Sequence, residues 1–221
     1  MLLEAILFDI DGTLVDSNDA HARCWMEAFA RFGKELGWDE VRSQMGKGGD
    51  LLVPELLNAR EMRRFGEAVK TYRTELWKEK YMPGVTPFAG ARVVLEALHG
   101  RGVKLAFASS SNADEVEYYT QLLGVGALVT ASTSKGDAAF SKPYPEIFRA
   151  ALERTGSDGE RTLVVGDTPY DIQAAHRIAL PIVAVRSGGF EDRLLGKAEF
   201  LFDDVEELWR EIDRVDDYFR V

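Results

Sequence analysis

Hydrophobic residues in this chain gather in short runs, and each run stops at a polar residue or a glycine. These runs are rich in Val, Ile, Leu, Phe and Ala and cover residues 2–8, 103–108, 127–130, 163–165, 181–185 and 200–202. Apolar runs of this length are typical of strands that are buried on both faces of a parallel sheet. The pattern therefore predicts a buried parallel sheet.

Amphipathic helical patterns lie between these runs, at residues 89–98, 113–123, 145–152, 172–178 and 205–215. Three of them are followed by a glycine, namely Gly100, Gly124 and Gly156, as is common at helix ends. Strands and helices in alternation predict an α/β fold with right-handed crossovers. The expected core is a Rossmann-like, doubly wound parallel sheet.

Residues 17–82 interrupt this alternation because they contain helical patterns but no convincing strand. The helical segments lie at residues 21–32, 51–57 and 60–81, with a glycine-rich turn at 46–49. So long a stretch exceeds what a single crossover needs. The sequence therefore predicts a helical domain at residues 17–85, inserted into a core formed by residues 1–16 and 86–221.

The chain is acidic, with 27 Lys and Arg against 37 Asp and Glu among 221 residues and a formal net charge of −10. It shows no basic stripe of the kind that nonspecific nucleic-acid binders carry, so we expect no nucleic-acid partner. An acidic protein repels anions at long range. An anionic substrate would therefore need cations close to its binding site.

The cysteine content and the first apolar run indicate the cellular compartment in which the protein is expected. Cys24 is the single cysteine, which excludes an intrachain disulfide and favours a cytoplasmic setting. The first run stops at Asp9, follows no basic segment and is far too short to cross a bilayer. We expect neither a signal peptide nor a membrane partner, and we expect a monomer or a small homo-oligomer.

Chemically useful side chains follow three of the predicted strands. They are Asp9, Asp11, Ser109, Asp167 and Asp171. In doubly wound sheets, ligands bind beyond the carboxyl ends of the strands, so these side chains are expected to converge on one crevice. Lys142 precedes a predicted helix and is expected to reach the same place.

Carboxylates that converge repel one another unless a cation compensates them. Oxygen ligands without a nearby His or Cys cluster favour Mg²⁺ over Zn²⁺, and bound Mg²⁺ accepts a phosphate oxygen. Asp9 could attack phosphorus, and Asp11, two residues later, could serve as acid and then as base. Gly12 lets the backbone turn closely around a phosphate. Lys142 could balance the charge on the transferred group.

Four segments resemble, in order, the motifs of the haloacid dehalogenase-like (HAD) superfamily. They are residues 9–17 (DIDGTLVDS), 107–112 (FASSSN), 141–148 (SKPYPEIF) and 165–172 (VGDTPYDI). Together they span most of the chain. The helical insert after the first segment resembles the C1-type cap of that superfamily.

The resemblance implies a role for each matched residue. Asp9 resembles the nucleophile and a magnesium ligand, and Asp11 resembles the general acid/base whose backbone carbonyl also binds the metal. Ser109 resembles the phosphate-binding hydroxyl, and Lys142 resembles the lysine that steadies the phosphoaspartate. Asp167 resembles the remaining direct metal ligand. Asp171 fits an outer or water-mediated position at the metal.

An aspartate at position 11 favours phosphoryl transfer, because dehalogenases of this superfamily lack it. We expect a Mg²⁺-dependent phosphatase that hydrolyses a small phosphorylated metabolite, such as a sugar phosphate or phosphoglycolate, through an aspartyl-phosphate. The alternative is a sugar-phosphate mutase similar to β-phosphoglucomutase. His21 has the spacing of a mutase hinge residue, but residues 45–50 lack the arginine of the mutase cap loop. A phospho-acceptor signalling domain is a distant alternative, because such domains are shorter and lack the insert.

Five further residues are candidates for substrate binding: Gly12, His21, Lys47, Ser110 and Asn112. His21 is expected to be a structural or hinge residue as much as a ligand. Lys47 lies in a glycine-rich turn that either folds over the crevice or stays solvated. Hinges of the insert are expected near Ser17 and near residues 82–84.

Overall fold

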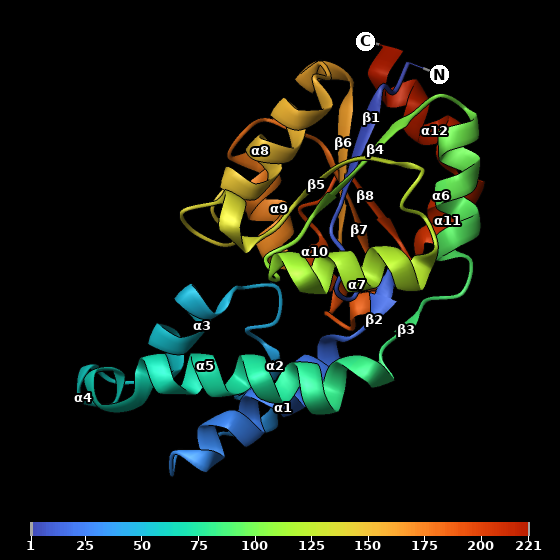
Figure 1. The fold of residues 1–221 in the computed structure, drawn as a ribbon. Helices are drawn as coiled ribbons and strands as arrows, with labels where there is room; N and C mark the ends of the chain where they lie inside the picture. The colour runs from blue at the N-terminus through green and yellow to red at the C-terminus, as the bar shows by residue number, and fades with distance from the viewer. Residues whose placement is uncertain (1, 221) are drawn as a thin grey trace.

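The computed structural model describes residues 2–220 and has a six-stranded parallel sheet at its centre (Figure 1). The spatial order of the strands is β5-β4-β1-β6-β7-β8. Their bounds are β1 Ala5–Phe8, β4 Lys104–Ala108, β5 Val129–Thr133, β6 Thr162–Gly166, β7 Ile182–Val185 and β8 Phe200–Phe202. Each neighbouring pair is parallel. The predicted α/β, Rossmann-like fold class is confirmed.

Helices cover both faces of the sheet (Figure 1). One layer holds α6 Ala91–Gly100, α7 Ala113–Leu123, α11 Val205–Arg210 and α12 Ile212–Asp217. The other holds α8 Glu146–Thr155, α9 Pro169–His176 and α10 Asp192–Leu195. Strand β1 explains the continuous apolar run, because Ile6 and Phe8 face the first layer and Leu7 faces the second. Among residues 2–220, no helix is long and apolar enough to cross a membrane.

A separate helical lobe lies beyond the carboxyl ends of the strands (Figure 1). It contains α1 Asn18–Arg31, α2 Trp38–Arg42, α3 Gly49–Leu56, α4 Ala59–Glu61 and α5 Glu67–Leu76, with π-helical turns at Met62–Gly66 and Trp77–Tyr81 and a 3₁₀ turn at Met82–Gly84. The lobe has its own buried core, which includes Trp25, Phe29, Leu52 and Val69. All of these elements fall within the predicted insert.

A short antiparallel ribbon joins the lobe to the sheet domain. Strand β2, Val15–Asp16, pairs with β3, Thr86–Pro87. The sequence pattern did not indicate this ribbon, because two residues per strand are too few to show any periodicity. The ribbon lies directly beside both expected hinges, and it fixes where the chain leaves and re-enters the core.

Some predicted elements have different bounds in the structure. The helix expected at residues 205–215 is divided at Glu211 into α11 and α12. Strand β5 begins two residues later than the apolar run at 127–130, because the Leu128 N–H donates to the Val125 carbonyl and closes a turn there. Helix α2 was missed, since five residues carry too little hydrophobic pattern.

Asp216 ties the start of the chain to the last helix. Its Oδ1 accepts hydrogen bonds from the backbone N–H groups of Leu2, at 2.7 Å, and Leu3, at 2.8 Å. Asp216→Ala leaves these donors unpaired, so we expect the free energy of unfolding in urea to fall by about 1–3 kcal/mol. Asp213→Ala, at an exposed pair with Arg101, should change it by less than about 0.5 kcal/mol. Equal stability of the two variants would contradict this role.

Candidate active site

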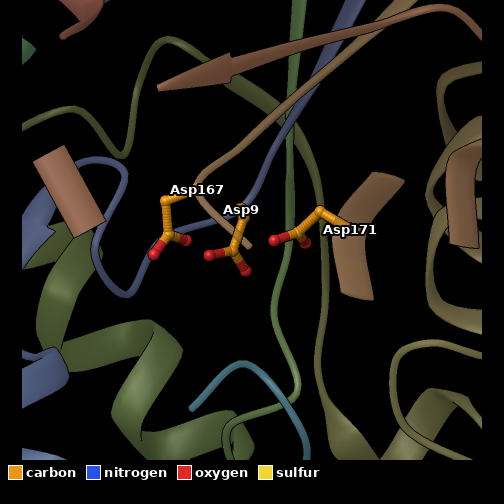
Figure 2. A group of neighbouring side chains, drawn as sticks. All are labelled: Asp9, Asp167 and Asp171. Carbon is orange, nitrogen blue, oxygen red and sulfur yellow. The ribbon is translucent and has the colours of Figure 1, made fainter. Parts of the chain in front are cut away.

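Three buried carboxylates meet at the carboxyl ends of neighbouring strands. Asp9 follows β1, Asp167 follows β6, and Asp171 lies in the first turn of α9. Each offers an oxygen within 4.8 Å of the others. Figure 2 shows the carboxylate of Asp9 between those of Asp167 and Asp171. The β4-β1-β6 order brings these distant segments together, as expected for parallel strand ends.

Lys142 supplies a cation to this cluster. Its side chain is fully buried, and its Nζ forms ion pairs with Asp9 Oδ1 and, at 2.8 Å, with Asp171 Oδ1. Burial alone lowers the pKa of Lys142, but the charges of Asp171 and Asp9 raise this pKa above its ordinary value. Lys142 is therefore held in its charged form.

Asp171 has a structural task as well as an electrostatic one. Its Oδ2 accepts hydrogen bonds from the Thr168 N–H, at 3.0 Å, and from Thr168 Oγ1, at 2.6 Å. In return, the Asp171 N–H donates to Thr168 Oγ1, which completes a capping box at the start of α9. The cap fixes the carboxylate, so its other oxygen faces Lys142.

The charge balance of the cluster favours a divalent cation. Burial raises the pKa of Asp9 to about 7, with Lys142 opposing and the charges of Asp171 and Asp11 adding to the rise. Burial and the charge of Asp9 also raise the pKa of Asp167. A divalent cation would relieve this repulsion, and carboxylate oxygens are ligands that hard cations prefer. Asp9 and Asp167 thus fit a divalent metal, with Asp171 beside them.

Asp167 is oriented by residues that sequence reasoning did not single out. Its Oδ2 accepts a hydrogen bond from Asn18 Nδ2 at 2.7 Å, and its Oδ1 accepts one from Thr13 Oγ1 at 3.3 Å. The backbone of Gly188 packs so closely that any side chain there would collide with this carboxylate. Gly188 could be seen in the sequence as part of a glycine pair after a predicted strand. Nothing in the sequence indicated that it packs against Asp167.

Asp11 lies apart from the cluster, under the helical lobe. It accepts hydrogen bonds from Ser17 Oγ at 2.6 Å and Ser111 Oγ at 2.9 Å, and it contacts His21 Nε2 at 2.9 Å. Burial raises the pKa of Asp11, but His21 and the two hydroxyls outweigh burial and hold this pKa well below its usual range. In this conformation Asp11 is held as a carboxylate. Gly12, with φ +78°, makes the turn that follows it.

His21 links Asp11 to the lobe. Its second ring nitrogen contacts the Arg73 guanidinium, and its ring stacks on Trp77 with centroids 3.6 Å apart. Arg73 also lies 3.7 Å from the buried carboxylate of Glu115. Sequence reasoning missed Arg73 and Glu115, because their meeting depends on how α5 lies against α7.

A cavity of about 80 Å³, open to solvent, lies between the lobe and the strand ends. Predicted residues along its wall are Asp9, Asp11, His21, Lys47, Ser110 and Asn112. Further residues that line it are Trp25, Lys70, Arg73, Ser111, Glu115 and Lys135. The cavity is therefore lined both by the candidate catalytic carboxylates of the core and by several Lys and Arg side chains.

The predicted residues that do not line the cavity are Gly12, Ser109, Lys142, Asp167 and Asp171. Ser109 is fully buried, and its Oγ accepts a hydrogen bond from the Ser111 N–H at 3.0 Å. The neighbouring Ser110 reaches the cavity, and its Oγ is buried without a hydrogen-bond partner among the described residues. The Lys47 Nζ donates to Gln44 Oε1 at 2.6 Å.

Comparison with known proteins shows which family the chain belongs to. The model of one family, described as haloacid dehalogenase-like hydrolase, matches residues 6–185. The chain belongs to the haloacid dehalogenase-like hydrolase family. It is thus an enzyme, and the resemblance of its four motifs is confirmed.

Curated relatives of the hydrolase carry phosphatase names. The pyrophosphatase PpaX of Oceanobacillus iheyensis is 27% identical over 185 residues, which cover 84% of each chain. A phosphoglycolate phosphatase of Rhodospirillum rubrum is 28% identical over 193 residues, covering 84% of this chain and 80% of that protein. A solved structure of a hydrolase from Pseudomonas syringae superposes with a TM-score of 0.84 at 25% identity, over 96% of this chain and 99% of that one.

Cation binding at Asp167 can be tested without any substrate. Mg²⁺ that binds only the folded protein should raise its stability, by about 2.7 kcal/mol at 100 times the dissociation constant. Asp167→Asn should lose this gain without lowering the unfolding temperature of the metal-free protein, because the substitution removes a repelling charge. Asp114→Asn, a surface change on α7, should behave like the wild type. Full Mg²⁺ stabilisation of Asp167→Asn in thermal unfolding would contradict the assignment.

Proposed function

We propose that the hydrolase is a Mg²⁺-dependent phosphatase that transfers the phosphoryl group of a small phosphomonoester to Asp9 and then to water. The observation that carries the proposal is the position of Asp9, on the cavity wall between Lys142 and Asp167. Lys142 engages its Oδ1, and no hydrogen bond from the described residues reaches its Oδ2. That oxygen is available as a nucleophile.

The first half of the proposed reaction forms a bond between Asp9 and phosphorus as the bond from phosphorus to the leaving oxygen breaks. Asp11 gives the leaving oxygen its proton, in a protonated form that requires release of its contacts with His21 and the two serine hydroxyls. Lys142, beside Asp9, offsets the negative charge of the phosphoryl group during its transfer. A bound Mg²⁺ would neutralise the charges of Asp9, Asp167 and the phosphoryl oxygens.

In the second half, Asp11 accepts a proton from a water molecule whose oxygen attacks phosphorus. The bond between phosphorus and Asp9 breaks, and inorganic phosphate leaves. The carboxylate form of Asp11 that this half requires is the form held by Ser17, Ser111 and His21. The lobe that bounds the cavity would limit access of water during the first half.

Cations on the cavity wall favour a substrate with a second acidic group. Lys70 and Arg73 lie three residues apart on α5, and Lys135 lies on the core side of the cavity. Lys70 is paired with the highly exposed Glu67, a weak competitor for a bound anion. The protein as a whole repels anions, so these cations matter for binding. The names of the two curated relatives, which describe doubly acidic substrates, support this class.

The same cations leave one second candidate, a mutase similar to β-phosphoglucomutase, because a mutase must also hold a second phosphate. Product analysis separates the two activities. Incubated with Mg²⁺ and a hexose 1-phosphate, the proposed phosphatase releases free hexose and inorganic phosphate. Accumulation of an isomeric hexose phosphate would instead show that the protein is a mutase.

Removal of the nucleophile provides a direct activity test. Asp9→Asn should lower turnover of p-nitrophenyl phosphate at least about 1,000-fold, because an amide cannot form the phosphoryl intermediate. Asp39→Asn, an exposed change on α2, should retain wild-type turnover. Steady-state rates with saturating Mg²⁺ measure both. Substantial turnover by pure Asp9→Asn would eliminate Asp9 as the nucleophile.

Lys70 should matter only for substrates with a second charge. Lys70→Met should raise the KM for phosphoglycolate about tenfold and leave the KM for p-nitrophenyl phosphate within about twofold, since one charge-assisted contact is lost. Lys80→Met, at an exposed pair with Glu27, is the matched control and should change neither value. An equal effect of Lys70→Met on both substrates would remove the argument for a second acidic group.

A further inference from the structure

The glycine-rich turn of the lobe rests directly on the segment that carries Lys142. We call residues 46–50, which include the first two residues of α3, the latch loop. The Gly48 N–H donates a hydrogen bond to Ser141 Oγ at 2.9 Å, and the Ser141 N–H donates one to Asp50 Oδ2 at 3.0 Å. Two reciprocal hydrogen bonds thus join the lobe to the residue immediately before Lys142.

Glycine is needed where the latch loop approaches the core. A Cβ on Gly48 would lie 2.8 Å from the Ser141 Cβ, and a Cβ on Gly46 would lie 2.7 Å from the Thr168 Cγ2. Gly46 also has φ +98°, a conformation that favours glycine. Thr168 is the residue that holds Asp171 in place. The latch loop therefore lies against two residues that help to place Lys142. These are Ser141, which precedes it, and Thr168, which positions its counter-ion Asp171.

The core segment that carries Lys142 depends on such support. Between β5 and α8 the chain forms only a 3₁₀ turn at Lys135–Asp137 before the helix begins at Glu146. A loop of this kind is positioned by its side-chain and backbone contacts rather than by the sheet. The N–H and the Oγ of Ser141 both bond to the lobe, so lifting the lobe would leave these two groups without their partners.

We propose that the latch loop couples closure of the lobe to the placement of Lys142 on Asp9, with Asp50 as the positioning residue. The proposal rests on the proposed function, since it assigns Lys142 to phosphoryl transfer. Closure then does more than exclude water. It completes the arrangement that stabilises the reacting phosphoryl group, so that chemistry is fast only when the cavity is covered.

Asp50 offers a graded test. Asp50→Ala removes the acceptor for the Ser141 N–H, whereas Asp50→Asn keeps an oxygen in the same place. We expect kcat for p-nitrophenyl phosphate to fall about tenfold in Asp50→Ala, with a smaller change in KM, because misplacement of Lys142 affects the chemical step. Asp50→Asn should recover kcat to within about threefold of wild type. Asp39→Ala, an exposed change in the same lobe, should leave kcat unchanged.

Hydrogen–deuterium exchange provides a readout that does not depend on activity. In Asp50→Ala, exchange should become faster both in the latch loop and in residues 138–145 of the core, and Asp50→Asn should restore most of the protection. Faster exchange confined to the latch loop, or an unchanged kcat in Asp50→Ala, would overturn the coupling. If the wild type hydrolysed no phosphomonoester, the proposed function would fail, while the exchange pattern would still decide whether the lobe and the Lys142 segment are linked.

Discussion

Lys142 is a fully buried ammonium group held between two carboxylates, and the arrangement of the rest of the site follows from that placement. A charge is costly to bury unless it is paired and hydrogen-bonded. Lys142 meets this condition through Asp9 and Asp171, which arrive from different segments of the chain. With Asp167, the cluster holds three carboxylates, which is more than a single lysine can balance. The excess negative charge is what makes the cluster suited to a divalent cation and a phosphoryl group.

The fold supplies each partner by a different local device. Parallel strands β1 and β6 place Asp9 and Asp167 side by side. The capping box of α9 turns Asp171 toward Lys142. Close packing at Gly188 and hydrogen bonds from Asn18 hold Asp167. Each of these contacts is local, and together they hold the charged side chains in fixed positions.

The sheet core and its carboxylates were predictable because their signals are local. Buried parallel strands need apolar runs, and the residues after such runs meet at one edge of the sheet, so Asp9 and Asp167 were expected to lie together. Lys142 was expected there because it precedes a predicted helix. The lobe was predictable as a long helical interruption. The ribbon of β2 and β3 was not, since its pairing involves two residues on each side.

Contacts across the two parts of the molecule could not be predicted in the same way. Arg73 meets Glu115, and Asp50 meets Ser141, only because of how the lobe packs on the core. Neither residue stands out from the many charged residues of amphipathic helices. Likewise, the turn after β4 decides that Ser110 and Ser111 face the cavity while Ser109 lies beneath it, and three consecutive serines carry no sign of that order.

The central claim, that Asp9 receives the phosphoryl group, is tested most directly by trapping the protein during turnover. The hydrolase would be mixed with Mg²⁺ and substrate, quenched in acid on the millisecond timescale, reduced with borohydride and mapped by mass spectrometry. The account predicts conversion of Asp9, and of no other aspartate, to homoserine in proportion to the phosphorylated fraction. Modification of a different aspartate instead of Asp9 would contradict it.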